Sequence, residues 1–173
     1  MTISESIQSI DFLTAIRESA LVYPVLLATH LACIAVFGGM ILMTDLRLLG
    51  LSFKNLTITE VVGSLRPWKR IGGVIMITCG VLLGSSEAVK YAPNPYFWTK
   101  MTVLCLIGIH ALIFRPLVYN NTEELDRSPM IPTKAKVAAS LSLVLWLSMA
   151  CLGRLIAYYE PKQEAPQASV FVK

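Results

Sequence analysis

The sequence predicts an all-α fold: a transmembrane four-helix up-and-down bundle with an N-terminal amphipathic interfacial helix. Composition is the first reason, because 55% of the 173 residues are hydrophobic and only 15% are charged. Long apolar segments are the second reason, and their runs are continuous rather than alternating as in a membrane β-barrel. Four crossings of about 20 residues each use roughly half of the chain. No room remains for a separate soluble catalytic domain, and no Gly-rich phosphate-binding loop occurs.

The N-terminal segment, residues 3–16, is predicted to lie along the membrane surface. Ile3, Ile7 and Ile10 fall on one helical face, whereas Glu5 and Gln8 fall elsewhere. An apolar stripe beside a polar face is typical of helices that lie in the membrane interface. Acidic residues interrupt the segment and no basic region precedes it, so we do not expect a signal peptide.

The predicted spans cover about residues 20–43, 71–88, 97–119 and 136–159. Before the second span, Thr57-Ile58-Thr59-Glu60 has the form of a capping box, which predicts a short interfacial helix that ends at Pro67. The spans form one domain over residues 1–160, and a flexible polar tail is expected over residues 161–173.

The distribution of Lys and Arg predicts how the protein sits in the membrane. The side with the two long loops carries nine of the 15 basic residues, and the side with the termini carries six. Cytoplasmic loops are enriched in Lys and Arg, so both termini are predicted on the outer side. The net charge of +4 is explained by this topology, and no nucleic-acid partner is expected. On the loop side, Asp45 and Arg47 are interpreted as a charge pair that closes the first span.

The two histidines, His30 and His110, both fall inside predicted spans and are the sharpest functional signal. Ionisable side chains are costly in hydrocarbon, so each needs a partner in the bundle interior. The first and third helices of an up-and-down bundle run in the same direction, and the expected depths of the two imidazoles differ by roughly 5 Å. Two imidazoles at one depth suit the axial positions of a b-type haem iron. One hypothesis is therefore a single haem b, with His30 and His110 as metal ligands.

Two further residues belong to this hypothetical haem site. Gly80, in the glycine-bearing second span, would let a flat macrocycle approach the backbone, although Gly80-x-x-x-Gly84 equally suits plain helix packing. Arg154 lies about one turn before the end of the fourth span, where its guanidinium can bind a propionate. Lys90 and Lys100 lie toward the terminal side, and their long stems are expected to carry their charges to the lipid headgroups.

Two alternatives stay open for the histidines. In the first, each imidazole only hydrogen-bonds to a neighbouring helix, and the protein is a cofactor-free structural or accessory membrane subunit. In the second, His30 and Cys33, one turn apart, join methionines in handling a soft metal such as copper. The four cysteines form no C-x-x-C motif. No span carries a nucleophile with its base, so no catalytic residue is proposed and a stand-alone enzyme is not expected.

The chain resembles an uncharacterised family of small four-span bacterial integral membrane proteins. The resemblance rests on Tyr23-Pro24, His30, Gly38-Gly39, Asp45-Leu46-Arg47-Leu48-Leu49-Gly50, Pro67-Trp68 and Phe97-x-x-Lys100. It covers most of residues 20–155 and implies a multi-pass protein of the bacterial inner membrane, without an assigned activity. More remotely, the histidine positions are similar to those of four-helix membrane cytochromes of the b type, which implies electron transfer with a quinone or a redox partner subunit. The chain lacks the additional histidines of two-haem members, and the sequence leaves its oligomeric state open.

Overall fold

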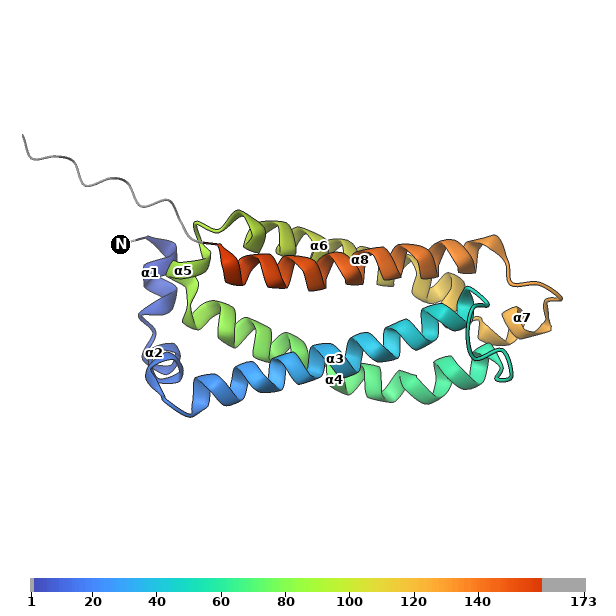
Figure 1. The fold of residues 1–173 in the computed structure, drawn as a ribbon, viewed down its shortest axis with the longest axis horizontal. Coiled ribbons are helices and arrows are strands. Elements are labelled where there is room, and N and C mark those ends of the chain that lie inside the picture. Colours follow the sequence, from blue (N-terminus) through green and yellow to red (C-terminus); the bar gives the residue numbers. More distant parts are fainter. Residues whose placement is uncertain (1, 160–173) are drawn as a thin grey trace, which may run out of the picture.

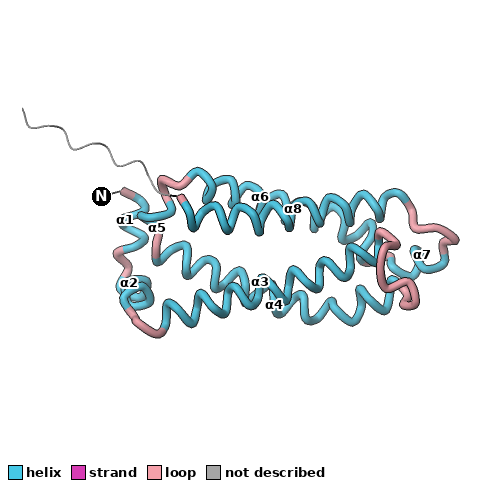
Figure 2. Tube along the Cα trace, in the orientation of Figure 1, coloured by secondary structure: helices cyan, strands magenta, loops and turns pink. Residues whose placement is uncertain are grey.

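The computed structural model describes residues 2–159, and all regular secondary structure within this range is helical (Figures 1 and 2). Its helices that are long and apolar enough to cross a membrane are Val22–Leu48, Ile58–Ser86, Pro95–Tyr119 and Thr133–Tyr158. Many large apolar side chains on these spans are exposed, which suits contact with lipid acyl chains. The prediction of an all-α four-helix membrane bundle is confirmed. The tail predicted at 161–173 lies outside the described residues.

The bundle consists of two helix pairs. Helix α3 (Val22–Leu48) packs along α4 (Ile58–Ser86), and α6 (Pro95–Phe114) packs along α8 (Thr133–Tyr158) (Figure 1). The pairs join chiefly through α3 and α8, whereas α4 and α6 barely touch although they follow one another along the chain. We call the end that carries the N-terminal helices the terminal end, and the opposite end, with the two long connections, the loop end (Figure 2).

Helix α3 runs past its predicted end at residue 43 and stops at Leu48. The reason is that the polar residues there are buried and partnered inside the bundle: Thr44 Oγ1 donates to the carbonyl of Met40, at 2.9 Å. Gly50, two residues after the last residue of the helix, adopts a φ of 73°, a conformation that glycine accepts at little cost.

Helix α4 corrects the prediction of a separate short helix that ends at Pro67. The predicted capping box is present, since Thr57 Oγ1 accepts from Glu60 N and Glu60 Oε2 accepts from Thr57 N. The helix that it starts then continues through Pro67 to Ser86. Within the helix, proline removes a single amide donor. Membrane helices tolerate proline where neighbouring structure holds the helix together.

The third span begins where Asn94 caps α6, and its side-chain oxygen accepts from Tyr96 N at 3.0 Å. After Phe114 the helix widens into one π-helical turn, η1 (Arg115–Tyr119), which contains Pro116. Such π turns arise where a helix takes in an extra residue, and they are frequent at functional sites. In this chain the turn orients Tyr119 toward α3.

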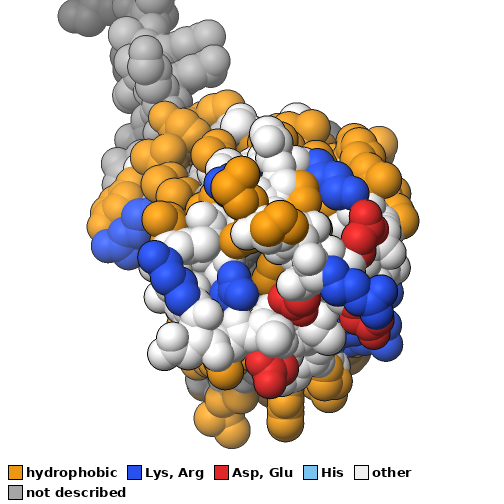
Figure 3. Space-filling view, turned by 90° about the vertical axis from the view of Figure 1, so that its right-hand side faces the viewer, with side chains coloured by type: hydrophobic (Ala, Val, Ile, Leu, Met, Phe, Trp, Pro, Cys, Tyr) orange, Lys and Arg blue, Asp and Glu red, His pale blue; other side chains and the backbone are white. Residues whose placement is uncertain are grey.

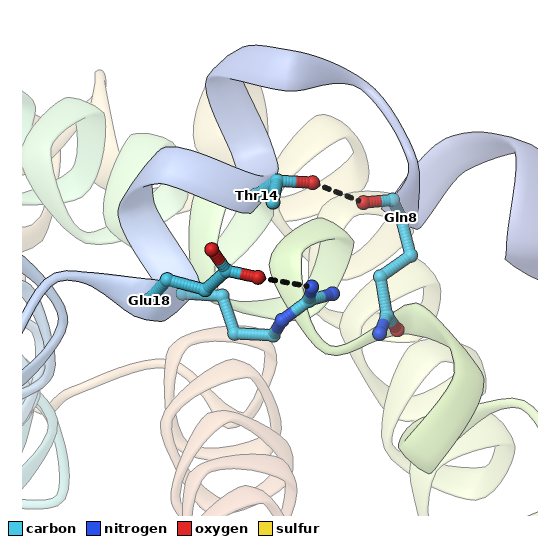
Figure 4. Close-up of polar contacts among 4 residues, drawn as sticks. Gln8, Thr14 and Glu18 are labelled. Atoms are coloured by element: carbon cyan, nitrogen blue, oxygen red, sulfur yellow. Dashed lines mark hydrogen bonds and ion pairs between the residues drawn. The ribbon is translucent and has the colours of Figure 1, made fainter.

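The N-terminal segment forms two helices rather than one, α1 (Ile3–Gln8) and α2 (Asp11–Glu18), separated by a turn at Ser9 and Ile10. The turn is held by Thr14, whose Oγ1 donates to the carbonyl of Gln8 at 3.1 Å, while Arg17 pairs with Glu18 (Figure 4).

These two helices pack on the terminal end of the bundle. Gln8 Oε1 accepts from Val89 N, at 2.8 Å, in the short helix α5 (Ala88–Tyr91). On α2, Leu13 and Ile16 are buried, and this helix contacts α3 and α4. The apolar face predicted for this segment therefore partly covers the bundle instead of facing lipid alone.

The loop end is closed by a small apolar core and by contacts between the two long connections. The core consists of Leu48, Ile58, Val62, Val118, Leu125, Ala135, Ala138 and Ala139. From the second connection, the short helix α7 (Thr122–Arg127) supplies Asp126, whose carboxylate accepts from Ile58 N at 2.7 Å and from Thr59 N at 2.9 Å. Charged side chains of both signs cover this end of the molecule (Figure 3).

Asp126 thus caps a helix that begins 68 residues earlier in the chain. Partial burial opposes ionisation of its carboxyl, but the hydrogen bonds from Thr59 and Ile58, with Arg47 nearby, outweigh burial and lower its pKa. The predicted charge pair between Asp45 and Arg47 is replaced by other contacts, because Arg47 Nε donates to the carbonyl of Leu56 at 2.8 Å.

Candidate functional site

The interior of the bundle is unevenly filled along its length. Buried residues of α3 lie only between Met40 and Leu48, those of α8 only between Ala135 and Leu145, and His110 is the buried residue of α6. We define the terminal half as residues 22–39, 95–109 and 146–158 with the facing part of α4. In this half the four long helices bury side chains only from α4: Met76, Cys79, Leu83 and Ser86. The terminal half therefore buries side chains from fewer helices than the loop end does.

His30 lies in this terminal half, on α3, with its ring against α4. A Cβ atom added to Gly80 would lie 3.0 Å from His30 Cε1, so the absence of a side chain at Gly80 is what admits the ring. Among the described residues, buried His30 Nδ1 has no hydrogen-bond partner, although the carbonyl of Met76 lies near the ring. A buried polar atom without a partner is costly and calls for an explanation.

Lys100, on α6, brings a positive charge to the same region. Its side chain is partly buried, and a Cβ atom added to Gly153 on α8 would lie 3.8 Å from Lys100 Nζ. Its amine is close enough to His30 to influence that ring electrostatically. The expectation that Lys100 carries its charge out to the headgroups is wrong, because the amine points across the bundle toward α8.

Aromatic residues border the terminal half at the terminal end. Tyr91 of α5 stacks on Phe97 of α6, with ring centroids 5.4 Å apart, and Phe97 in turn lies 4.0 Å from a Cβ atom added to Gly84. Burial, together with the neighbouring Tyr23, raises the pKa of Tyr91 to about 12, so its phenol stays neutral at physiological pH.

His110 has a different environment. Its side chain is buried, and Nε2 donates to the carbonyl of Ala138 on α8, at 2.9 Å. Its ring also packs on Phe114, with centroids 4.8 Å apart. This imidazole has a partner on the neighbouring helix and joins α6 to α8.

The two histidines lie toward opposite ends of the bundle. His30 lies beside Gly80, which is six residues or about 9 Å from the terminal end of α4. His110 is bonded to Ala138, which is five residues or about 8 Å from the loop end of α8. The spans are about 40 Å long. The structure therefore does not bring His30 and His110 together at one depth.

Arg154 lies apart from His30 and Gly80 as well. Its side chain is exposed, Nη2 donates to Tyr158 Oη, and the guanidinium stacks 4.7 Å above the Tyr158 ring. Of the residues predicted for a haem site, the structure brings together only His30 and Gly80. Among residues 2–159, no three His, Cys, Asp or Glu side chains gather as a metal site, and all four cysteines are free.

A second polar cluster, which sequence reasoning missed, lies inside the loop end. Asp45 of α3 is 1% exposed, and its Oδ1 accepts from Tyr119 Oη at 3.2 Å. Lys69 of α4 donates to Thr44 Oγ1 at 3.0 Å, and Ser142 of α8 lies beside the carboxylate. The sequence signal was present, since an acidic residue and a lysine flank the apolar segments, but each looked like an ordinary helix end.

This loop-end cluster joins α3, α4, η1 and α8, and its members largely bond one another. Buried polar networks of this kind fix the relative positions of helices. The terminal half differs, because His30 and Lys100 converge there without partners. In general, an imidazole can coordinate a Lewis-acidic centre, and an ammonium group can donate to an anionic acceptor.

Comparison with known proteins identifies the family without assigning an activity. No curated protein and no solved structure matches the chain. A family of unknown function, DUF6644, matches residues 12–159, which include the four membrane helices, both histidines and Lys100. The chain therefore belongs to the DUF6644 family.

Proposed function

We propose that the protein is a membrane haem-binding protein that holds one b-type haem in the terminal half of its bundle, with His30 as the axial ligand. The observation that carries this proposal is the half-buried His30 ring, which lies against Gly80 and whose Nδ1 is buried without a hydrogen-bond partner. An imidazole oriented by a nearby backbone carbonyl, with a ring nitrogen to spare, is how proteins commonly present histidine to a metal.

Only some of the residues predicted from the sequence to bind haem fit that role, so we propose one histidine ligand instead of two. His30, with Gly80 beside it, suits the group, whereas His110 Nε2 is committed to Ala138 and lies near the other end. The proposal therefore keeps His30 and gives His110 a structural role. A haem would supply one-electron chemistry, and a quinone or a redox partner subunit is the expected exchange partner.

A second candidate function is a cofactor-free accessory membrane subunit. The hydrogen bond from His110 to the carbonyl of Ala138 favours it, because it shows one intramembrane histidine used only to join helices. In that case His30 makes the corresponding tie to α4, and the protein acts by binding a partner within the membrane. A copper-handling role has less support, because no three His, Cys, Asp or Glu side chains gather as a metal site among the described residues.

The first experiment is an absorption spectrum of the protein purified in mild detergent and supplied with haemin, oxidised and then reduced with dithionite. A pyridine haemochrome assay counts haem per chain. His30→Ala and His110→Ala are measured beside the wild type, with thermal unfolding as the test of folding. We expect a reducible b-type spectrum in the wild type and in His110→Ala, and its loss in a folded His30→Ala variant.

Other outcomes decide between the hypotheses. A colourless wild type overturns the proposal and favours the accessory subunit, which should then co-purify with a stable partner. Loss of haem from both variants while they remain folded would restore the pair of histidine ligands and contradict the separation of the two rings. Retention of haem by His30→Ala would remove His30 from the site.

We propose a multi-pass location in the bacterial inner membrane, with both termini on the outer side. The excess of Lys and Arg on the loop side supports this orientation. Cysteine accessibility tests it, because the loops contain no natural cysteine: a cysteine at Ser128 should react with a membrane-impermeant maleimide only after cells are lysed. Labelling of intact cells would reverse the orientation.

A further inference from the structure

Lys100, in the terminal half, has no counter-charge among residues 2–159. Among residues 2–159, no carboxylate lies near enough to Lys100 to interact with its amine, and Lys100 makes no hydrogen bond to another described residue. Cationic side chains inside a membrane normally pair with an acid, a carbonyl or a ligand. Lys100 thus lacks the partner that its position requires.

The Lys100 amine lies inside the terminal end of its helix pair rather than beyond it. Lys100 is five residues inside α6, and Gly153, beside which its Nζ lies, is five residues inside the end of α8. Both positions correspond to a depth of about 8 Å within the helical span. A snorkelling lysine would instead extend along its own helix toward the terminal end. The amine instead lies beside Gly153 of the neighbouring helix α8, close enough to His30 to influence its ring electrostatically.

We propose that Lys100 is the counter-charge for a carboxylate of the ligand that His30 holds. This inference rests on the proposed haem function, because haem b carries two propionate carboxylates beside an iron that an imidazole can bind. Gly153 is part of the site, since the absence of a side chain there leaves room for the amine. Arg154, the residue expected from the sequence to bind a propionate, is instead bonded to Tyr158 at the surface.

The test compares two probes, haemin and its dimethyl ester. The two share the same iron and ring, but only the propionates of haemin carry a charge. Each is titrated into the detergent-solubilised full chain, for the wild type, Lys100→Gln and Lys90→Gln. Lys90 is the matched control because it is an exposed lysine at the same end of the bundle. A charge-assisted contact predicts that the wild type and Lys90→Gln bind haemin about 10- to 100-fold more tightly than the ester.

Lys100→Gln should bind haemin and the ester equally. If the wild type also binds the two equally, or if Lys100→Gln keeps the preference, the inference about Lys100 is wrong while the haem proposal stands. If the wild type binds neither probe, the haem proposal fails and takes this inference with it.

The melting temperature provides a second test of the role of Lys100, and it does not require a measurement of probe affinity. In the ligand-free protein, Lys100→Gln should raise the melting temperature, because it removes an uncompensated charge from the membrane span. With haemin bound, the same substitution should lower the melting temperature relative to the wild type, because the pair with the carboxylate is lost. A change of the same sign in both states would contradict the inference.

Discussion

The loop end and the terminal half of the bundle differ in the burial of their side chains and in the partners of their polar groups. At the loop end, Leu48 and Val118 are fully buried, and Asp45 has partners from neighbouring helices. In the terminal half α4 alone of the four long helices contributes buried side chains, and among the described residues His30 Nδ1 and the Lys100 amine have no hydrogen-bond partner. The difference teaches that the polar groups that hold the helices together lie at the loop end, whereas the candidate ligand-binding groups lie in the terminal half.

The largest effect should come from overpacking the loop end. Ala139 is fully buried in its core, so Ala139→Leu forces extra carbon atoms into filled space and should destabilise the protein by about 3 kcal/mol. The control is Ala150→Leu on the same helix, where the residue is exposed and the change should be close to neutral. Thermal unfolding in detergent measures both. Equal melting temperatures would show that the two halves are packed alike.

Removing a partner from the loop-end cluster should have the next largest effect. Tyr119→Phe deletes the hydroxyl that donates to Asp45 Oδ1, and the other carboxylate oxygen, Oδ2, already lacks a partner. Leaving a buried acceptor unpaired costs about 2 kcal/mol. Tyr158→Phe, at an exposed tyrosine, should change the free energy of unfolding little. A stable Tyr119→Phe variant would mean that this network does not hold the helices.

Asp126→Asn should cost about 1 kcal/mol at neutral pH, because the neutral amide is a weaker cap for α4. The folded state lowers the pKa of Asp126, so its contribution is complete above the unfolded pKa of about 3.9 and is lost as pH falls through the lower folded value. The variant should therefore be less sensitive to acid than the wild type in unfolding measured against pH. Glu124→Gln, at an exposed residue of the same helix, is the control.

The smallest effect on stability, and the sharpest on the ligand site, should come from Gly80→Ala. The new methyl group would meet His30 Cε1 at 3.0 Å and displace the ring, which offsets the gain of about 1 kcal/mol in helix propensity. Gly108→Ala meets nothing within 4 Å, so it should keep the full gain. With haemin, only Gly80→Ala should shift the absorption bands. Identical spectra for the two variants would argue against a ligand at His30.

Much of the fold could be predicted from local sequence, and most of the candidate site could not. The capping box at Thr57 and Glu60 was predicted and is present, because it depends on residues three apart. Pro67 was misjudged, because tolerance of proline within a helix depends on what surrounds it. His30 and Gly80 were identified as candidates, whereas the interior position of Lys100 depends on α8 and has no local signal.

The sequence by itself determined that the chain is a four-helix membrane protein, because apolar runs long enough to cross a bilayer must satisfy their backbone internally as helices. It also singled out both histidines. Only the tertiary structure decided that His110 is joined to Ala138 near the loop end while His30 lies against Gly80 near the terminal end. The physical reason is that the depth and partner of a side chain depend on where its helix begins and which helix faces it, and neither is encoded within a single span.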